Sequence, residues 1–399
     1  MTEALWDWHD ANGFTRVINV SGTMTGLGAS VTGSAARKAT AEAMGHFVKM
    51  HELQEHAGQV ISRLTGAEAG CVTASASAGI SLCVAGCMTG LNPSRAEALP
   101  AVPGSRDTVV AQAGHLCHYG APVETAVGLT GGKLRVIGQS TQCADHQLEG
   151  ALDENVAAAL YVVSHHVVHY GQIPFARFVE IAHRAGVPVI VDAASEYDLT
   201  GFIEQGADLA IYSGHKFLSG PTSGIIAGRR DLVRAAYLQN IGIGRGMKVG
   251  KESIMGLIAA MEDWMTRDAA AIRAAERAAL EEWQAAVADL PGITARVVPD
   301  PTNNPLDRLQ IEIDPQEAGA NAAIFAAVLG RQDPAIIVRD HEVELGYFQL
   351  DPCNLLPGQQ VLVADTLRHV LGSGGDVLDH AEADPRNGSI RAYLDWGQG

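Results

Sequence analysis

Residues 188–221 read PVIVDAASEYDLTGFIEQGADLAIYSGHKFLSGP and contain two short apolar runs, each of which leads to a titratable side chain. The run Pro188–Asp192 ends in a carboxylate, and the run Leu209–Ser213 is followed three residues later by Lys216. Short runs rich in Val and Ile, without polar alternation, are typical of strands buried on both faces of a parallel sheet. Ligands of open α/β sheets bind at the carboxyl ends of the strands, so we expect Asp192 and Lys216 to lie at a binding edge.

Similar apolar runs recur on both sides of this stretch and predict five further strands. They are Gly70–Thr73, Thr108–Ala111, Leu134–Ile137, Leu160–Ser164 and Gly224–Ala227. The spacers between them are long enough for crossover helices; in one, Pro174 opens the helical pattern FARFVEIAHRAG and Gly186 closes it. The sequence therefore predicts an α/β fold with a large, mostly parallel sheet of about seven strands.

The C-terminal third has a different pattern and predicts a second, smaller α+β domain. Strands are expected at Ile293–Val298, Arg308–Ile313, Ala335–Val338 and Tyr347–Leu350, with helices near Gln316–Leu329 and Gly358–Leu371. We therefore expect an N-terminal segment at 1–50 that contributes to the active site and a dimer, a large ligand-binding domain at 51–250, one long connecting helix at 251–291 and a small domain at 292–399.

Composition narrows the class of protein. The 399 residues are 47% hydrophobic and 18% charged, with a formal net charge of −17. Such an acidic chain repels nucleic acids and anionic membrane surfaces. The opening MTEALWDWHDANG carries acids and no basic n-region, and the six cysteines form no C-x-x-C pair. We expect a cytoplasmic enzyme with reduced cysteines, and neither a nucleic-acid partner nor a membrane partner.

Three local features together indicate one cofactor. Crowding by small residues around Lys216 would desolvate its amine, and Asp192 needs a cationic or N–H partner. The stretch Thr73–Gly79, TASASAG, brings a strand into a helix start where backbone N–H groups favour a phosphate. Each feature alone also fits a structural role: a solvated loop lysine, a capping aspartate or an ordinary helix start. A phosphate cup, an acid for a pyridinium nitrogen and a Schiff-base lysine together are what pyridoxal 5′-phosphate (PLP) requires.

Further motifs carry a family resemblance. They are NVSGTMT at 19–25, ELQEHAG at 52–58, LTGAEA at 64–69 and GIGRGMKVGKE at 242–252. With the segment from Asp192 to Lys216, they resemble the SelA-like (selenocysteine-synthase-like) family of fold-type I PLP-dependent enzymes, over about residues 15–370. The most similar branch contains D-glucosaminate-6-phosphate ammonia-lyase.

The resemblance implies roles for individual residues. Lys216 matches the lysine that carries PLP and Asp192 the acid at its ring nitrogen. The remaining cofactor-binding residues it implies are Ser75, Ser77, Ala78, Gly79, Ser213 and His215. The substrate-binding residues it implies are Arg339, for the α-carboxylate, together with Arg245, Lys248, Thr23 and Thr25. Lys251 is a further candidate for a substrate anion.

An aromatic ring is expected to stack on the cofactor from the segment GHLCHY at 114–119. His115 matches the family's histidine, while His118 and Tyr119 remain alternatives. The spacing His165-x-x-x-His169 superficially resembles a metal motif, but it follows a strand and lacks a general-base Glu, so no metal is expected.

The resemblance implies a lyase. Lys216 would remove the α-proton of a small anionic amino acid or amino-sugar acid, and loss of a β-hydroxyl as water would yield a 2-oxo acid and ammonia. We expect a homodimer or a higher homo-oligomer. An aminotransferase or a racemase would use the same residues and stays open. A selenium transferase acting on seryl-tRNA and a non-catalytic PLP-binding protein fit less well.

Overall fold

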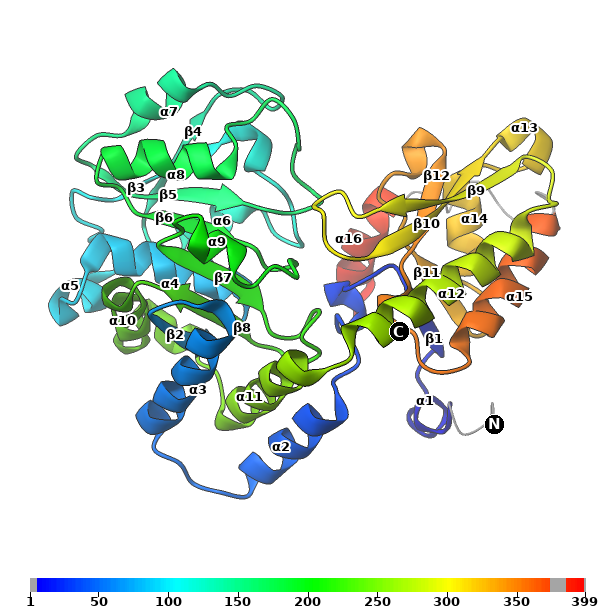
Figure 1. Ribbon diagram of the computed structural model, residues 1–399, viewed down its shortest axis with the longest axis horizontal. Helices are drawn as coiled ribbons and strands as arrows, with labels where there is room; N and C mark the ends of the chain where they lie inside the picture. Colours follow the sequence, from blue (N-terminus) through cyan, green and yellow to red (C-terminus); the bar gives the residue numbers. More distant parts are fainter. Residues whose placement is uncertain (1–5, 374–384, 398–399) are drawn as a thin grey trace. The chain divides into compact units, whose positions relative to one another are not determined.

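The computed structural model describes residues 6–373 and 385–397, which form two compact units (Figure 1). The large unit spans residues 30–267, and the small unit combines residues 1–29 with residues 268–399. The N-terminal segment up to Ala29 therefore belongs to the small unit, although the rest of that unit lies more than two hundred residues further along the chain.

The large unit is built on a seven-stranded sheet in the order β2-β8-β7-β6-β5-β3-β4. Its strands are β2 (Ala69–Thr73), β3 (Thr108–Gln112), β4 (Lys133–Ile137), β5 (Val156–Val162), β6 (Val189–Asp192), β7 (Leu209–Ser213) and β8 (Gly224–Gly228). The pairs among β3 to β7 are parallel, whereas β8 is antiparallel to both β7 and β2. The predicted large, mostly parallel sheet is confirmed; the fifth strand begins and ends earlier than the expected Leu160–Ser164.

Helices cover both faces of this sheet. Along β6, Val189 and Val191 pack into one apolar cluster and Ile190 into another. The first cluster includes residues of α3 (Met50–Thr65), α7 (Asp145–Ala151), α8 (Phe175–Arg184) and α11 (Lys251–Thr266); the second includes residues of α4 (Ala76–Thr89), α6 (Val123–Gly128) and α10 (Arg230–Leu238). Strands covered on both faces explain the uninterrupted apolar runs of the sequence. The unit also contains α2 (Ser34–Met44), α5 (Pro93–Ala98) and α9 (Gly201–Glu204).

The long helix expected over 251–291 is two helices. α11 ends at Thr266, because Arg267 adopts an extended conformation with ψ of 148°. Asp268 then caps α12 (Ala269–Val287) by accepting a hydrogen bond from the Ala271 N–H. The break coincides with the boundary between the two units.

The small unit contains two separate sheets. β12 (Tyr347–Leu350), β10 (Asp307–Ile313) and β9 (Ile293–Pro299) form an antiparallel sheet in that order, and β1 (Val17–Val20) pairs in parallel with β11 (Ala335–Val338). The helices are α1 (Asp7–Asn12), α12, α13 (Pro315–Ala318), α14 (Ala322–Leu329), α15 (Gln359–Gly372) and α16 (Pro385–Asp395). Trp283, Phe325 and Phe348 are the largest fully buried side chains of its core. No helix within the described residues is long and apolar enough to cross a membrane.

Candidate active site

Asp192 and the segment leading to Lys216 lie side by side at the carboxyl edge of the large sheet. β6 and β7 are adjacent and parallel, with Asp192 paired to Ile211, two residues before the end of β7. After Ser213 the chain turns tightly: the Gly214 N–H donates to the Ser223 carbonyl at 2.9 Å, and the Gly220 N–H donates to the Gly214 carbonyl at 2.9 Å. A Cβ at Gly214 would lie 2.2 Å from the Ser223 Oγ, so only glycine fits this turn.

The amine of Lys216 is held inside the large unit. Its Nζ donates a short hydrogen bond to the Ser195 Oγ, three residues after Asp192. Burial lowers the pKa of Lys216, while Asp192, Glu196 and Cys117 oppose that shift. Burial thus favours the neutral amine of Lys216, in the direction that the crowding argument from sequence predicts.

Asp192 is a buried carboxylate with little to stabilise its charge. The residue is 7% exposed, and its Oδ1 accepts one hydrogen bond from the Ala194 N–H at 3.2 Å. Burial raises the pKa of Asp192 to about 6, against the opposing effects of Lys216 and of that N–H. The carboxylate therefore suits a cationic partner, which the pyridinium nitrogen of PLP would supply.

The predicted phosphate cup lies at the start of α4, where β2 ends. Ser75 is the N-cap, and its Oγ accepts a hydrogen bond from the Ala78 N–H at 3.1 Å. The Ser77 Oγ is 3.1 Å from the Tyr119 hydroxyl. The Thr73 Oγ1 is buried and has no hydrogen-bond partner among the described residues. A Cβ at Gly224 would lie 2.4 Å from the Ser75 backbone. The backbone of β8 therefore packs directly against the backbone of the predicted phosphate cup.

Ser213 and His215 flank the lysine turn as a hydrogen-bonded pair. The Ser213 Oγ is 3.1 Å from the His215 Nδ1, and the Ser30 Oγ donates to the His215 carbonyl at 2.7 Å. Burial lowers the pKa of His215, and the nearby Lys216 lowers it further. His215 is therefore neutral at physiological pH and available for hydrogen bonding rather than for charge pairing.

His115 is enclosed in the large unit. It is 2% exposed, its ring centroid is 4.3 Å from that of Tyr161 at an interplanar angle of 86°, and its Nδ1 accepts the Val162 N–H at 3.3 Å. Burial lowers the pKa of His115 to about 4, with a contribution from His169. These contacts fix a neutral imidazole behind the ends of β3 and β5. His118, by contrast, is exposed.

Arg339 follows β11 in the small unit and is 4% exposed. Its Nη2 is 3.6 Å from the Glu342 Oε1, and its Nε has no partner within residues 6–373 and 385–397. Burial lowers the pKa of Arg339, and Arg308 adds to that shift. Arg308 itself is paired, with Asp300 at 2.7 Å and with Asp351 at 3.0 Å. Arg339 thus retains donor capacity for a further anion. Thr23 is half-buried and Thr25 exposed in the same unit.

The basic residues of the segment 242–252 differ in their surroundings: two are exposed, and one is held by hydrogen bonds. Arg245 and Lys248 are exposed, and the described part of the chain provides no ion-pair partner for either. Lys251 instead donates hydrogen bonds to the carbonyls of Met44 and His46 and lies 5.7 Å above the Phe47 ring. Lys251 therefore has a structural role where α11 begins.

Comparison with known proteins gives the family. The family model described as "SelA: L-seryl-tRNA selenium transferase" matches residues 17–288. The chain belongs to the SelA family. The resemblance seen in the sequence motifs is confirmed.

Relatives within this family match over nearly the whole chain. The D-glucosaminate-6-phosphate ammonia lyase of Salmonella typhimurium is 37% identical over 364 residues, which cover 91% of this chain and 98% of that protein. A 5′-C-glycyluridine monooxygenase-decarboxylase of a Streptomyces species is 34% identical over 93% of this chain and 92% of the relative. A solved D-glucosaminate-6-phosphate ammonia-lyase structure superposes with a TM-score of 0.84 at 36% identity, covering 94% of this chain and all of the other.

More distant structures share the fold alone. A serine palmitoyltransferase of Sphingomonas wittichii superposes with a TM-score of 0.56 at 12% identity, over 88% of this chain and 86% of that chain. Another structure, described as SPT with PLP, superposes with a TM-score of 0.56 at 15% identity, over 88% of this chain and 87% of that chain. The predicted fold-type I architecture is confirmed.

Four residues that lie close to the predicted site residues are not among those predicted from the sequence. Ser195, Glu196 and Cys117 surround Lys216, and Tyr161 contacts His115. Ser195 and Glu196 directly follow the strand that ends at Asp192, so their place at the binding edge could have been inferred from the sequence. Burial raises the pKa of the Cys117 thiol to about 11, so Cys117 is not a thiolate nucleophile.

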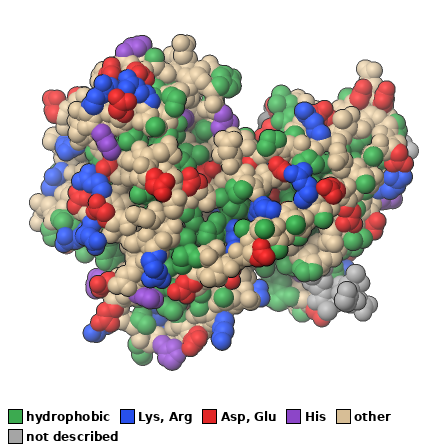
Figure 2. Space-filling model, viewed as in Figure 1, with side chains coloured by type: hydrophobic (Ala, Val, Ile, Leu, Met, Phe, Trp, Pro, Cys, Tyr) green, Lys and Arg blue, Asp and Glu red, His purple; other side chains and the backbone are tan. Residues whose placement is uncertain are grey.

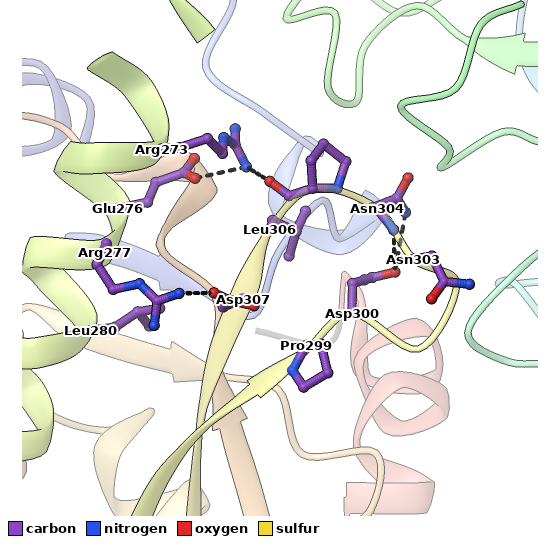
Figure 3. Close-up of a pocket in the computed structure, with 11 residues that line it drawn as sticks. Arg273, Glu276, Arg277, Leu280, Pro299, Asp300, Asn303, Asn304, Leu306 and Asp307 are labelled. Carbon is purple, nitrogen blue, oxygen red and sulfur yellow. Dashed lines mark hydrogen bonds and ion pairs between the residues drawn. The ribbon is translucent and has the colours of Figure 1, made fainter. Parts of the chain in front are cut away.

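A cavity of about 460 Å³ lies in the small unit, between α12 and the β9–β10 connection (Figure 3). None of the predicted site residues lines it, and its charged groups are paired, Asp300 with Arg308 outside the lining. Arg273 is 2.8 Å from Glu276 and Arg277 contacts Asp307, while Asp300 accepts hydrogen bonds from the loop that begins at Thr302. Its polar groups therefore serve to hold the small unit together.

The histidine run after β5 forms a ring pair. The centroids of His165 and His166 are 4.0 Å apart. In the described ranges, no three His, Cys, Asp or Glu residues are arranged to hold a metal ion.

Proposed function

We propose that this SelA-family protein is a PLP-dependent ammonia-lyase that acts on an amino-sugar acid or a small β-hydroxy amino acid. The observation that carries the proposal is the part-buried hydrogen bond between Lys216 and Ser195 beside Asp192, at the sheet edge where ligands bind. The substrate class rests on the 37% identity to a D-glucosaminate-6-phosphate ammonia lyase over almost the full length of both proteins.

The residues present fit PLP. Asp192 is a buried acid whose raised pKa a ring-nitrogen cation would bring down again, and Lys216 is a half-buried amine within its electrostatic reach. At the start of α4, the free N–H groups and the Ser77 hydroxyl suit the phosphate, and the unpartnered Thr73 hydroxyl lies at the same strand end. We assign Ser75, Ala78, Gly79, Ser213 and His215 to the same binding region.

PLP, when bound, supplies an electron-withdrawing ring that accepts the electrons left at Cα when the α-proton is removed. Lys216 is the residue proposed to take that proton, because burial favours its neutral, basic amine. The Ser195 hydroxyl orients this amine by accepting its N–H. Asp192 keeps a proton on the ring nitrogen, and His115 is proposed as the ring that stacks on the cofactor, held by Tyr161 and the Val162 N–H.

Substrate anions are assigned to the cations that the fold leaves available. Arg339 is proposed to bind the α-carboxylate, because its buried guanidinium has an unpartnered Nε among the described residues and a fork that matches a carboxylate. Arg245 and Lys248 are proposed for a second anionic group of the substrate, and Thr23 and Thr25 for its hydroxyl groups. The assignments of Arg245, Lys248, Thr23 and Thr25 rest on the family resemblance.

The test is a visible absorbance band. Wild-type protein reconstituted with PLP should show a band that borohydride bleaches and that Lys216→Ala lacks, whereas the exposed Lys38→Ala on α2 should retain it. Ammonia release should fall by at least about 10²–10⁴-fold in Lys216→Ala. If the wild-type protein shows no such band, the proposal fails.

A substrate panel tests the reaction class. β-Hydroxy amino acids and phosphorylated amino-sugar acids should yield ammonia and a 2-oxo acid without an added keto acceptor. Turnover that requires an acceptor would instead make the protein an aminotransferase, and turnover confined to inversion at Cα would make it a racemase. Incorporation of selenium into seryl-tRNA would overturn the small-molecule proposal.

Assembly and location complete the proposal. Phe47 is fully exposed and Met44 is 65% exposed, so the connection between α2 and α3 offers apolar surface to a second copy of the chain. All six cysteines are free thiols, which suits a reducing cytoplasm. Acidic and basic side chains intermingle on the face of the large unit drawn in Figure 2, and with a net charge of −17 we propose a small-molecule substrate rather than a nucleic acid.

A further inference from the structure

Tyr119 connects two parts of the large unit that are distant in sequence. It lies in the loop after the short helix η3 (Ala113–His115), where its N–H donates to the Ala121 carbonyl at 3.2 Å. Its ring is half-buried and packs against the apolar cluster that contains α4. Its hydroxyl is 3.1 Å from the Ser77 Oγ, a hydrogen bond across 42 residues.

This hydrogen bond places a phenol at a helix start. Ser77 is the second residue of α4, and the Ser75 side chain satisfies only the Ala78 N–H of the first turn. The other N–H groups of the first turn have no intrahelical acceptor and favour an anion. The buried Thr73 hydroxyl, unpartnered within the described residues, is a second polar group at this strand end.

We propose that the Tyr119 hydroxyl is a ligand of the anionic phosphate that binds at the start of α4. The inference rests on the proposed function, because PLP supplies that phosphate. Tyr119 donates its hydroxyl proton to a phosphate oxygen, and Ser77 holds the phenol in place. The hydrogen bond to Ser77 thus assigns Tyr119 to the phosphate end of the cofactor, and the stacking position is left to another ring.

The protonation state of Tyr119 supports this role. Burial raises the pKa of its phenol, and the hydrogen bond with Ser77 only partly opposes that effect. Asp192 adds to the rise, which indicates that the hydroxyl also lies within electrostatic reach of the ring-nitrogen acid. A phenol that stays protonated at neutral pH is a donor, as a phosphate ligand must be.

The test compares two ligands that differ only in the phosphate. Dissociation constants of PLP and of pyridoxal are measured by absorbance for wild-type, Tyr119→Phe and the control Tyr170→Phe, whose ring is 68% exposed. A lost hydrogen bond to a charged group corresponds to about 10-fold or more in affinity. Tyr119→Phe should bind PLP more weakly than the wild type by that factor and should bind pyridoxal with wild-type affinity. Tyr170→Phe should bind both ligands as the wild type does.

The possible results separate this inference from the proposed function. Equal PLP affinity of Tyr119→Phe and wild type, or an equal loss for PLP and pyridoxal, overturns the phosphate role of Tyr119 while the cofactor assignment stands. A wild-type protein that forms no visible band with PLP overturns both. In addition, the ³¹P resonance of bound PLP should move in Tyr119→Phe and stay in place in Tyr170→Phe.

Discussion

Replacing Asp192 with Asn should stabilise the PLP-free protein at pH 8, although the same change should impair the PLP-bound enzyme. Asp192 is 7% exposed, and ionising it inside the protein is unfavourable because burial outweighs the attraction of Lys216. An Asn side chain removes the charge and keeps an oxygen that can accept the Ala194 N–H. The substitution therefore reports the free energy of holding this charge beside Lys216 in the fold.

The magnitude follows from the pKa of Asp192. The folded value of about 6 lies above the reference value of 3.8, so the folded protein binds this proton more tightly than the unfolded chain does. Between pH 3.8 and 6 the unfolded chain ionises first, and stability falls as the pH rises through this window. Above pH 6 the ionised Asp192 lowers the free energy of unfolding by its full amount. The difference between the two pKa values corresponds to about 3 kcal/mol, at 1.36 kcal/mol per pKa unit.

The pH dependence of wild-type stability cannot by itself reveal the Asp192 contribution, because His115 titrates in almost the same range. Its folded pKa of about 4 lies below the reference value of 6.5, so stability rises with pH through almost the same window and by a similar amount. The two effects oppose each other in the wild type. The difference between wild type and Asp192→Asn removes the His115 contribution, which both proteins share.

The assay is urea unfolding of PLP-free wild type, Asp192→Asn and Asp263→Asn, an exposed position on α11, from pH 4 to pH 8. The free energy of unfolding of Asp192→Asn should exceed that of the wild type by about 3 kcal/mol at pH 8. This difference should shrink toward zero at pH 4. Asp263→Asn should show no such trend. A difference that does not change with pH, or an Asp192→Asn protein that is less stable at pH 8, would refute the reasoning.

Two further predictions concern the surroundings of Lys216 and the basic run. Glu196→Gln should move the acidic limb of the kcat profile to lower pH, because Glu196 raises the pKa of Lys216; an unmoved limb in steady-state assays would exclude Glu196 from that role. Lys251→Met should lower the free energy of unfolding by about 1–2 kcal/mol, because Lys251 donates to two backbone carbonyls, whereas Lys248→Met should leave it unchanged in urea titrations. Equal stability of these two variants would contradict the structural role of Lys251.

The strands of the large sheet are predictable from the sequence because they are buried on both faces. Val189–Val191 and Leu209–Ile211 carry no polar residue, and the structure places both in the interior with exposures of 0%. The carboxyl-edge rule then brings Asp192 close to Lys216 without knowledge of side-chain contacts. This part of the site follows from local pattern and sheet geometry.

The small unit is less predictable, because its central pairing joins distant segments. β1 lies at Val17–Val20, and its partner β11 begins at Ala335. The apolar pattern of VINV does not distinguish a strand from other buried segments, and nothing local specifies a partner more than three hundred residues away. The break between α11 and α12 has a local cause, the Asp268 cap, but a long Ala- and Glu-rich pattern conceals it.

The same limit applies to the residues that adjust the site, and it explains why Ser195 and Tyr119 differ in how they could be found. Ser195 reaches Lys216 because β6 and β7 are neighbours, so the residues after Asp192 must pass the lysine turn. Tyr119 and Ser77 follow β3 and β2, which have four strands between them, and no spacing in the chain encodes their contact. A lysine, its acid and the serine beside them can therefore be recognised from their strands, whereas the phenol that completes a phosphate site requires the tertiary structure.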